Sequence, residues 1–476
     1  MKNLIIILLI TYFNSFGQKQ ANIWYFGNGA GLDFNQTCDP IVLTDGGING
    51  FEGCATISDK LTGQLLFSTN SEWVWNRNQV IIPNSNLVAN GNTITQVMII
   101  PKPTFDSIYY IITSEVQSYS GQGYQFHSID MTLNGGLGGI AFKDSLLYLS
   151  PVTEKITAIS HANGTDIWIV GHQYNSNKFL SFLVTSSGIN TTPVISQIGK
   201  INSDYSTSDA IGELKASPDG SKLASVTLRH PNIELFDFNN STGQISNLIS
   251  ITENGGYDTI SGCSGLYGLS FSPNNSLLYV SQWYAPSLGV SKIIQYNIAS
   301  NDSTTINSSR INVFTSNESY YSLKLAPNGK IYVARNVNQN YIGVINCPDS
   351  VGLNCNYVNS GVYLGGKQSG WGLNNLMEYG IYCKPITTSI NENEISKIKI
   401  YPNPFSTQTT LQTDNFLKDA TLTVDNCFGQ AVKQIKNIAG QTVVLSRDNL
   451  PRGMYFLRLT ENNKTLTVDK LVITDK

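Results

Sequence analysis

The sequence has little charge. Lysine, arginine, aspartate and glutamate make up 13% of its 476 residues, whereas about 25% is usual for globular domains. Helices exposed to water carry Glu and Lys on their outer faces, so the composition argues against a mainly helical protein. The net charge of −3 argues against a nucleic-acid scaffold, which would show a basic surface. Because 41% of the residues are hydrophobic, the low charge does not indicate disorder.

Residues and motifs typical of metal and cofactor chemistry are also scarce. The chain has four histidines, and none forms an HExxH or HxH pair. A GxSxG nucleophile elbow, a phosphate-binding loop and a dinucleotide fingerprint are all missing. We therefore expect no metal and no cofactor. Calcium held by loop aspartates such as Asp258 or Asp302 is the alternative, although the acidic run of a calcium-binding loop is missing as well.

The N-terminal segment has the pattern of a signal peptide. Lys2 supplies a positive start, residues 4–10 form an unbroken apolar run, and Ser15 and Gly17 are the small residues before a cut at Gln18. The apolar segment is too short for a membrane span of about 20 residues, and no other run approaches that length. We predict a signal peptide over residues 1–17 and no transmembrane segment; a buried N-terminal strand is the alternative.

A repeat fills residues 21–384. Its clearest copies begin at Leu214, Leu269 and Leu323, and each reads as a strand, a Pro-Asp/Asn turn and a second strand. Weaker copies are anchored near residues 55, 97 and 158, which gives a period of roughly 40–60 residues with four strands each. Four strands per repeat is the blade of a β-propeller. The sequence therefore predicts an all-β protein with six complete blades.

Two remaining segments predict a seventh blade. The segment at residues 23–35 reads as second and third strands without a first strand, and residues 371–377 read as a first strand without partners. A blade shared by both ends of the repeat region would close the ring and remove an exposed sheet edge. We expect Leu373 to pair with Trp24 or its neighbours.

The repeats resemble known propeller families. The Ser217-Pro218-Asp219-Gly220 turn is similar to those of WD-type and YVTN-type repeats, although no Trp-Asp dipeptide ends a blade. The segments at residues 22–28 and 51–59 resemble a propeller family of surface proteins from gliding Bacteroidota-type bacteria. This resemblance implies a fold and a surface location, and no activity.

The last 92 residues hold 11 basic and 9 acidic side chains, about twice the charge density of the rest of the chain. The change predicts a linker over residues 385–397 and a second domain over residues 398–476. Short alternating strands in that domain predict a small antiparallel sandwich. Prolines after the first strand and a glycine before a later one mark its turns.

The motifs of this second domain resemble the type A C-terminal sorting domain of the type IX secretion system, although Cys427 stands where a small or aliphatic residue is usual. The residues that carry the resemblance are Tyr401, Pro402, Asn403, Pro404, Gly429, Gly453, Tyr455 and Lys470. The resemblance implies a Greek-key sandwich that is recognised by the translocon and then removed. The protein would be secreted or attached to the outer cell surface.

A ligand-binding face is predicted on the loops that join second and third strands and on the entries to first strands. Aromatic plates on a rigid scaffold suit a sugar or a peptide. The candidate residues are Trp73, His172, Tyr174, Arg229, His230, Trp283, Tyr284 and Arg335. The alternative is that these residues only pack against neighbouring loops. Glu115, Asp209 and Glu213 could supply a carboxylate pair for glycoside hydrolysis.

The seven cysteines predict disulfides, because an exported chain meets oxidising conditions. Cys347 with Cys355 is the first expected pair, and Cys38 with Cys54 the second. The odd count leaves at least one free thiol, for which Cys427 is the candidate.

These observations favour an exported, non-catalytic propeller that binds an extracellular glycan or protein and no nucleic acid. A propeller hydrolase or lyase acting on polysaccharide, and a structural adhesin without a pocket, are the alternatives.

Overall fold

The fold is given by a computed structural model. It describes residues 19–36, 38–87, 96–115, 121–202, 209–228, 232–252, 265–283, 289–336, 338–378, 398–426, 430–461 and 464–475. The expected signal peptide and linker lie outside these residues. The chain divides into two compact units, Met1–Pro385 and Ile386–Lys476.

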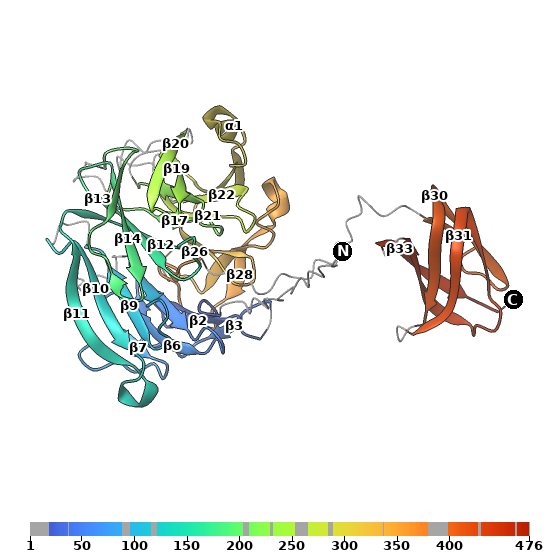
Figure 1. Cartoon of the computed structure of the whole chain (residues 1–476), viewed down its shortest axis with the longest axis horizontal. Helices are drawn as coiled ribbons and strands as arrows, with labels where there is room; N and C mark the ends of the chain where they lie inside the picture. The colour runs from blue at the N-terminus through green and yellow to red at the C-terminus, as the bar shows by residue number, and fades with distance from the viewer. Residues whose placement is uncertain are drawn as a thin grey trace, which may run out of the picture. The chain divides into compact units, whose positions relative to one another are not determined.

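The first unit is a seven-bladed β-propeller (Figure 1). Its described strands form seven antiparallel sheets, each following the order of the chain from the hub outward except the first. The first sheet, ordered β3-β2-β1-β4, contains β1 (Ile23–Asn28), β2 (Ala30–Asp33), β3 (Ile41–Leu43) and β4 (Asn49–Gly50). The second contains β5 (Ala55–Ser58), β6 (Leu65–Thr69) and β7 (Val74–Asn76). The third contains β8 (Val97–Pro101), β9 (Ile108–Thr113), β10 (Tyr124–Asp130) and β11 (Gly139–Tyr148).

The remaining four sheets complete the ring. The fourth contains β12 (Val152–Ser160), β13 (Ile167–Gln173), β14 (Lys178–Thr185), β15 (Gly188–Ile189) and β16 (Val194–Gln197). The fifth contains β17 (Leu214–Ala216), β18 (Lys222–Val226), β19 (Asn232–Asn239) and β20 (Gln244–Thr252). The sixth contains β21 (Leu266–Phe271), β22 (Leu277–Gln282), β23 (Ser291–Asn297) and β24 (Ile311–Ser316). The seventh contains β25 (Tyr320–Leu325), β26 (Ile331–Arg335), β27 (Tyr341–Ile345) and β28 (Tyr357–Tyr363). Short helices of the described chain are α1 (Ser303–Ser308), η1 (Asn134–Gly136) and η2 (Gly352–Cys355).

The proline turns of the repeat form the hairpins that the sequence predicts. In the β17–β18 turn, the Asp219 carboxylate accepts hydrogen bonds from the Ser217 hydroxyl at 2.6 Å and from the Ser221 amide at 3.0 Å. Gly220 has φ +69°, a left-handed value that a residue with a Cβ adopts only with strain. The Pro-Asp turn therefore fixes where this first strand ends.

The ring closes where the first sheet meets residues 368–375. The amide of Asn28 donates to the carbonyl of Gln368 at 2.9 Å, so both ends of the propeller share a blade as expected. The expected partner of Leu373 differs in detail. Next along this segment, Trp371 and Asn375 donate to the carbonyls of Phe51 and Cys54 rather than to the strand that contains Trp24. The reason is that the segment runs beside the entry to β5, the inner strand of the next sheet.

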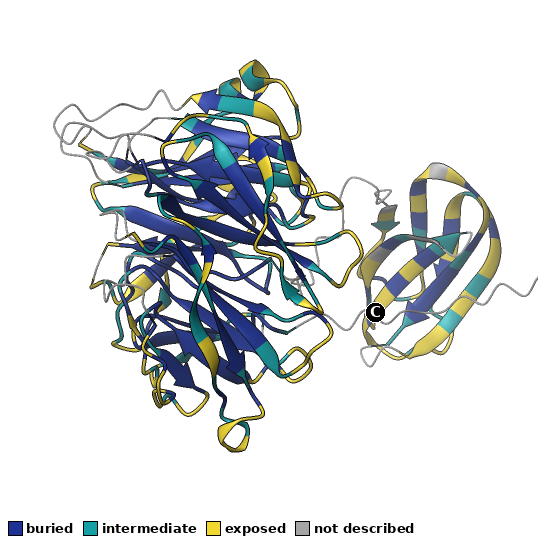
Figure 2. Cartoon of the chain, turned by 60° about the vertical axis from the view of Figure 1, so that its left-hand side comes forward, coloured by how far each residue is buried: buried dark blue, intermediate teal, exposed yellow. Residues whose placement is uncertain are grey.

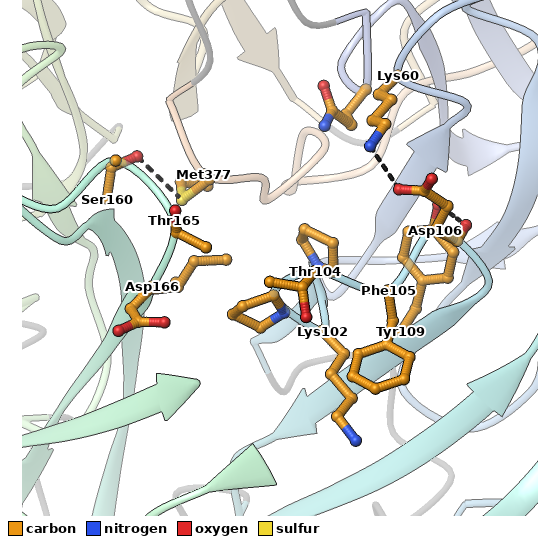
Figure 3. Close-up of a pocket in the computed structure, with 15 residues that line it drawn as sticks. Lys60, Lys102, Thr104, Phe105, Asp106, Tyr109, Ser160, Thr165, Asp166 and Met377 are labelled. Atoms are coloured by element: carbon orange, nitrogen blue, oxygen red, sulfur yellow. Dashed lines mark hydrogen bonds and ion pairs between the residues drawn. The ribbon is translucent and has the colours of Figure 1, made fainter. Parts of the chain in front are cut away.

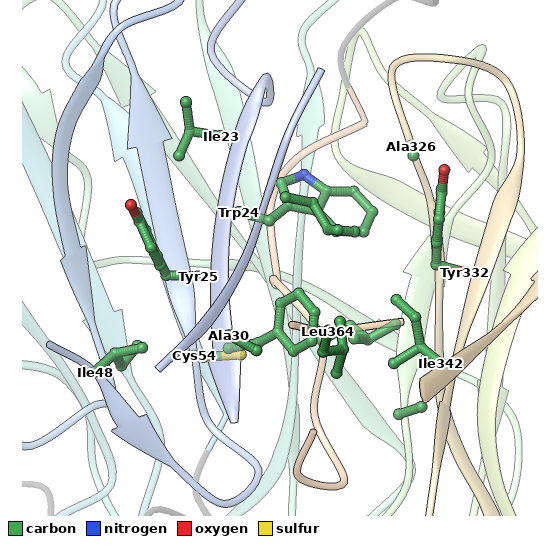
Figure 4. Packing of buried hydrophobic residues seen from close by; sticks show 14 of the residues in the cluster. Ile23, Trp24, Tyr25, Ala30, Ile48, Cys54, Ala326, Tyr332, Ile342 and Leu364 are labelled. Atoms are coloured by element: carbon green, nitrogen blue, oxygen red, sulfur yellow. The ribbon is translucent and has the colours of Figure 1, made fainter. Parts of the chain in front are cut away.

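An aromatic cluster holds this closure together (Figure 4). Trp24 is completely buried, and its ring centroid lies 5.0 Å from that of Phe34 and 5.7 Å from that of Tyr332 on β26. Its indole nitrogen donates to the carbonyl of Ala21 at 2.8 Å. The first and seventh sheets are thus joined by apolar packing as well as by the strand contact.

The second unit is a curled five-stranded sheet that is roughly sandwich-like. Its strands are β29 (Ile398–Tyr401), β30 (Gln408–Asp425), β31 (Ala431–Ser446), β32 (Gly453–Glu461) and β33 (Lys464–Ile473). The long strand β30 pairs with β29 and β31 in its first half and with β31 and β32 in its second. Phe405 bridges to Ile473, which brings the ends of the sheet together. Figure 2 shows the resulting alternation of buried and exposed residues along these strands.

The sorting motif fastens the start of this unit to its end. The Asn403 side chain donates to the carbonyl of Lys470 at 2.7 Å and accepts from the amide of Val472 at 2.9 Å. The Tyr455 hydroxyl donates to the carbonyl of Pro451 at 2.7 Å. Tyr401 is 81% exposed and makes no comparable side-chain bond in the described chain. Gly429 and Cys427 lie outside the described residues.

The described cysteines differ from both expected pairs. Cys54, Cys347 and Cys355 are free thiols, whereas Cys38 is in a disulfide. Cys347 is exposed and Cys355 is buried, although their backbones are joined by a hydrogen bond of 2.9 Å. Cys54 packs in the hydrophobic cluster at the ring closure, where burial raises the pKa of its thiol to about 12. Neighbouring positions in sequence therefore do not bring these sulfur atoms together.

Within the described residues, every helix is too short or too polar to cross a membrane.

Candidate binding site at the hub of the propeller

At least six charged side chains of the described residues are buried where the inner strands of the blades converge. None is more than 6% exposed. They lie within or just before the inner strands. They are Glu52, Glu154, Lys155, Glu213, Lys215 and Lys324. Buried charges are costly unless they are paired or neutralised, so this concentration needs an explanation.

Glu213 is held by three neighbouring blades. Its Oε1 accepts from the Ser322 hydroxyl at 2.6 Å and lies 3.4 Å from the Lys215 ammonium. Its Oε2 accepts from the Leu269 amide at 2.9 Å. Lys324 is held in the same way, with its ammonium 2.7 Å from both the Glu378 carboxylate and the carbonyl of Leu376. These groups are satisfied and stabilise the ring.

Glu52 is different, because only one of its oxygens has a described partner. The Tyr267 hydroxyl donates to Oε1, while Oε2 is buried and has no partner among the described residues. Burial, followed by the nearby carboxylates of Glu154 and Glu213, raises the pKa of Glu52 well above its usual range. The neutral carboxyl is therefore favoured, and it carries a proton that can be donated.

Aromatic rings surround Glu52. Tyr321 stacks on Trp371 with ring centroids 4.7 Å apart and an interplanar angle of 11°. Tyr267 meets the edge of Tyr321 at 5.4 Å, and Trp283 meets it at 6.4 Å. Trp283 and Trp371 are only partly buried, yet their indole nitrogens are buried without a described hydrogen-bond partner. We call Glu52, Tyr267, Trp283, Tyr321 and Trp371 the hub site.

The hub site contains one sequence-predicted residue, Trp283, together with four that were missed. Trp73 and Trp283 are both partly buried and pack on the hydrophobic cluster that contains Tyr267 and Tyr321. Glu52, Tyr267, Tyr321 and Trp371 were not predicted. Glu52, Tyr267 and Tyr321 lie at or just before the start of an inner strand, whereas Trp371 lies in the segment that closes the ring. The entries to first strands were part of the predicted binding face, so position relative to the repeat could have indicated the first three.

Three predicted residues are buried within blades. His172 is 2% exposed, its Nδ1 lies 3.3 Å from the Asn202 amide nitrogen, and burial lowers its pKa to about 3. Tyr174 is 5% exposed. Arg335 is paired with Glu318 and donates to the Ser360 hydroxyl at 3.0 Å, near the edge of the seventh sheet. Predicted residues that lie outside the described chain are Arg229, His230 and Tyr284.

The predicted carboxylate trio consists mostly of groups that are already bonded to other residues of the propeller. Both oxygens of Glu115 are used, because they accept from the Ser150 hydroxyl and from the amides of Val152, Gln122 and Gly123 at 2.7–3.1 Å. Glu213 binds the three blades described above. Asp209 is buried near Lys155. Burial lowers the pKa of Lys155 to about 8, and the charges of Glu234 and Asp209 oppose that effect.

Sequence comparison identifies the second unit. The secretion system C-terminal sorting domain family matches residues 399–474, the segment that forms the curled sheet. The chain thus carries a type IX sorting domain, which marks it as an exported protein, secreted or displayed at the cell surface. No curated protein matches the sequence.

Several solved structures are similar to the chain in backbone trace. The β-propeller domain of a protein from Myceliophteria thermophila is 10% identical, with a TM-score of 0.38 and coverage of 66% of this chain and 94% of that one. A periplasmic gluconolactonase from Pseudomonas aeruginosa is 10% identical, with a TM-score of 0.36 and coverage of 80% and 94%. A functionally unknown protein from Desulfotomaculum acetoxidans is 12% identical, with a TM-score of 0.40 and coverage of 75% and 99%. Likenesses at this level carry no argument about activity.

Proposed function

We propose that this exported propeller is a non-catalytic binding module that takes a glycan at the hub site. The observation that supports the proposal is the pair of buried indole N–H groups of Trp283 and Trp371, which have no partner among the described residues, beside the neutral carboxyl of Glu52. A buried donor without an acceptor costs about 1–3 kcal/mol. A site that retains two such donors is suited to a ligand, or to ordered water, that supplies the acceptors.

A sugar matches both features of the site. Its hydroxyl and ring oxygens accept hydrogen bonds from indole N–H groups, and its C–H faces pack on aromatic rings. Tyr321, Trp371 and Trp283 offer such rings within one contiguous cluster. A small-molecule site typically has aromatic and apolar walls with a small number of precisely placed polar groups.

A polysaccharide hydrolase or lyase is a second candidate, favoured by one observation. Glu52 has the raised pKa of a general acid and is close enough to Glu154 and Glu213 for their charges to act on it. Against this, Glu213 is occupied by three blade contacts. A single test distinguishes the binding module from the enzyme. Only an enzyme would release shortened products from the glycan that it binds.

The test uses the mature full-length protein on a glycan array, followed by calorimetry with each retained glycan. We expect Trp283→Phe to weaken binding by about three- to tenfold, the equivalent of one lost hydrogen bond, and Trp283→Ala to weaken it further. Phe142→Ala is the matched control, because Phe142 is a 41% exposed aromatic residue on β11 and lies outside the hub site. The proposal fails if no glycan is retained, or if both Trp283 variants bind as the unchanged protein does. Failure to retain any glycan would favour a structural adhesin.

A further inference from the structure

A small hollow opens on the face of the propeller opposite to the hub site (Figure 3). The inner strands run from the hub site to the turns that join first and second strands, and the hollow lies among those turns. It measures about 220 Å³ and lies between the β8–β9 turn, residues 101–106, and the β12–β13 turn, residues 160–167. Met377 and Gln20 also line it.

The walls combine apolar surface with hydroxyl groups, which both donate and accept hydrogen bonds. Pro101, Pro103 and the 41% exposed Phe105 supply apolar surface. Hydroxyl groups come from Thr104 and Thr165 on opposite sides of the hollow (Figure 3).

Charge is nearly balanced around the hollow. Lys60 pairs with Asp106 at one side. The Lys102 ammonium lies 4.3 Å from the centroid of the Phe105 ring. Across the hollow, the Asp166 carboxylate accepts from the Asn163 side chain at 2.8 Å through one oxygen. One cation and one carboxylate therefore remain available, which favours an uncharged ligand with several hydroxyl groups over an anion or a cation.

Thr104 adopts a backbone conformation that its side chain disfavours. Its φ is +66°, and left-handed values are rare for a β-branched residue because its Cβ crowds the backbone. Residues held in such conformations concentrate at functional sites. Thr104 lies at the rim of the hollow, so its conformation bears directly on the shape of the hollow.

A neighbouring hollow makes a useful contrast. It measures about 200 Å³, lies between the β12–β13 turn and the β17–β18 turn, and shares Ser160, Gly164 and Met377 with the first. Small residues such as Ala158, Ala216 and Gly220 form much of its wall, and its described lining contains no lysine. Similar size with different chemistry indicates that the groups around the first hollow do not follow from the repeat alone.

We propose that the hollow around Thr104 is a second ligand site, independent of the hub site, which takes a single neutral hexose ring. Its volume is below the roughly 300–1,000 Å³ of pockets that hold drug-sized ligands, so one ring fits and a longer chain would project from it. The apolar wall packs against the C–H face of the sugar. The hydroxyls of Thr104 and Thr165 and the charged groups of Lys102 and Asp166 bind its hydroxyls.

The test measures binding of methyl glycosides of mannose, galactose and glucose to the mature full-length protein by saturation-transfer NMR and calorimetry. We expect one of them to bind. Thr165→Trp, placed in an exposed turn, should fill the hollow and abolish binding, and Phe105→Ala should weaken it about tenfold. The matched controls are Leu61→Trp, on a 70% exposed turn residue of the same face, and Phe142→Ala, whose phenylalanine is as exposed as Phe105.

Thr104→Gly separates a functional role of the strained residue from a structural one. Glycine adopts this conformation without strain, so the melting temperature should stay the same or rise. Binding of the glycoside should fall, because the hydroxyl is lost. A variant that keeps full affinity would overturn the role of Thr104.

The two sites are distinguished by crossing the variants. If glycoside binding is lost in Trp283→Ala and kept in Thr165→Trp, the hollow is not a site and the hub proposal stands. If the reverse holds, the hollow is confirmed whatever the outcome at the hub. Failure of all three glycosides to bind overturns the proposal.

Discussion

The hydroxyl of Tyr267 donates a hydrogen bond to the buried carboxyl of Glu52, which lies 215 residues earlier in the chain. The bond joins the first strand of the sixth sheet to the loop before the first strand of the second sheet. It crosses the hub beside the aromatic rings of the hub site. Because the other carboxyl oxygen has no described partner, this one bond fixes the orientation of the group that we expect to meet the ligand.

The first prediction concerns the pH dependence that Glu52 gives to stability. Its pKa is raised in the folded protein, so above the pKa of the unfolded chain the folded state binds more protons than the unfolded state. The free energy of unfolding therefore falls as pH rises from about 4.5 toward the folded pKa. Glu52→Gln keeps a carbonyl acceptor for Tyr267 and cannot ionise. We expect this variant to lose less stability between pH 5 and pH 8, as measured by urea unfolding.

Comparison with Glu115→Gln provides the control for this experiment, because Glu115 accepts four hydrogen bonds as a carboxylate. That variant should be destabilised at neutral pH, since an amide nitrogen cannot accept. Equal responses of the two variants to pH would contradict the assignment of a neutral Glu52.

The second prediction concerns His127 and His172. Burial, followed by the charge of a nearby lysine, lowers the pKa of each to about 3. The unfolded chain takes up protons near pH 6.5 while the folded protein does not, so stability falls as pH decreases from about 6.5 toward 3. Each histidine should cost about 1.6 kcal/mol between pH 6.5 and pH 5. In NMR, neither imidazole should titrate above pH 4.

His127→Asn tests the effect on stability. The Nδ1 atom of His127 accepts from the Asp144 amide at 2.9 Å, and the asparagine carbonyl can take over that role. The variant should be less stable than the unchanged protein at pH 7 and should show a flatter loss toward pH 5. A variant that loses stability as steeply as the unchanged protein would show that His127 does not resist protonation.

The sequence predicted the architecture well because the repeat is local. The Pro-Asx turns after Ala216, Phe271 and Leu325 are set by residues adjacent in the chain, and each forms the expected hairpin. The sorting domain was recognised for a similar reason, from short motifs in a fixed order. The seven sheets were predicted from six complete repeats and one blade shared by both ends of the repeat region.

The candidate site was harder to predict because it is assembled from distant segments. Glu52, Tyr267 and Trp371 become neighbours only when the ring closes. The sequence also does not show whether a residue near a loop points outward. Arg335 ends strand β26, where its pairing with Tyr320 and its ion pair with Glu318 hold it inside the sheet. Its place at the end of a second strand had suggested a loop position.

The third prediction tests the ring closure. Trp24 is fully buried between Phe34 and Tyr332 at the contact of the first and seventh sheets. Trp24→Ala removes a large apolar side chain and leaves a cavity, so it should lower the free energy of unfolding by about 3–5 kcal/mol. Leu61→Ala, at a 70% exposed position, should change it by about 0.5 kcal/mol or less. Urea unfolding monitored by tryptophan fluorescence measures both, and a small effect of Trp24→Ala would show that the ring does not depend on this cluster.

The fourth prediction separates folding of the sorting domain from its recognition. Asn403 joins the turn after β29 to β33 through two hydrogen bonds, so Asn403→Ala should destabilise the domain by about 1–3 kcal/mol. Tyr401 is 81% exposed, so Tyr401→Ala should leave its stability nearly unchanged. If the translocon reads the surface around the motif, both variants should be exported less efficiently, although only Asn403→Ala melts at a lower temperature.

Deletion of residues 398–476 provides the reference for complete loss of export, because a protein that lacks the sorting domain should accumulate in the periplasm. Fractionation of cells that express each form, with the propeller detected by antibody, gives the amount outside the cell. Normal export of Tyr401→Ala, together with poor export of Asn403→Ala, would mean that the fold is recognised and that this side chain is not. Surface display of the deletion variant would show that the propeller reaches the surface without the sorting domain.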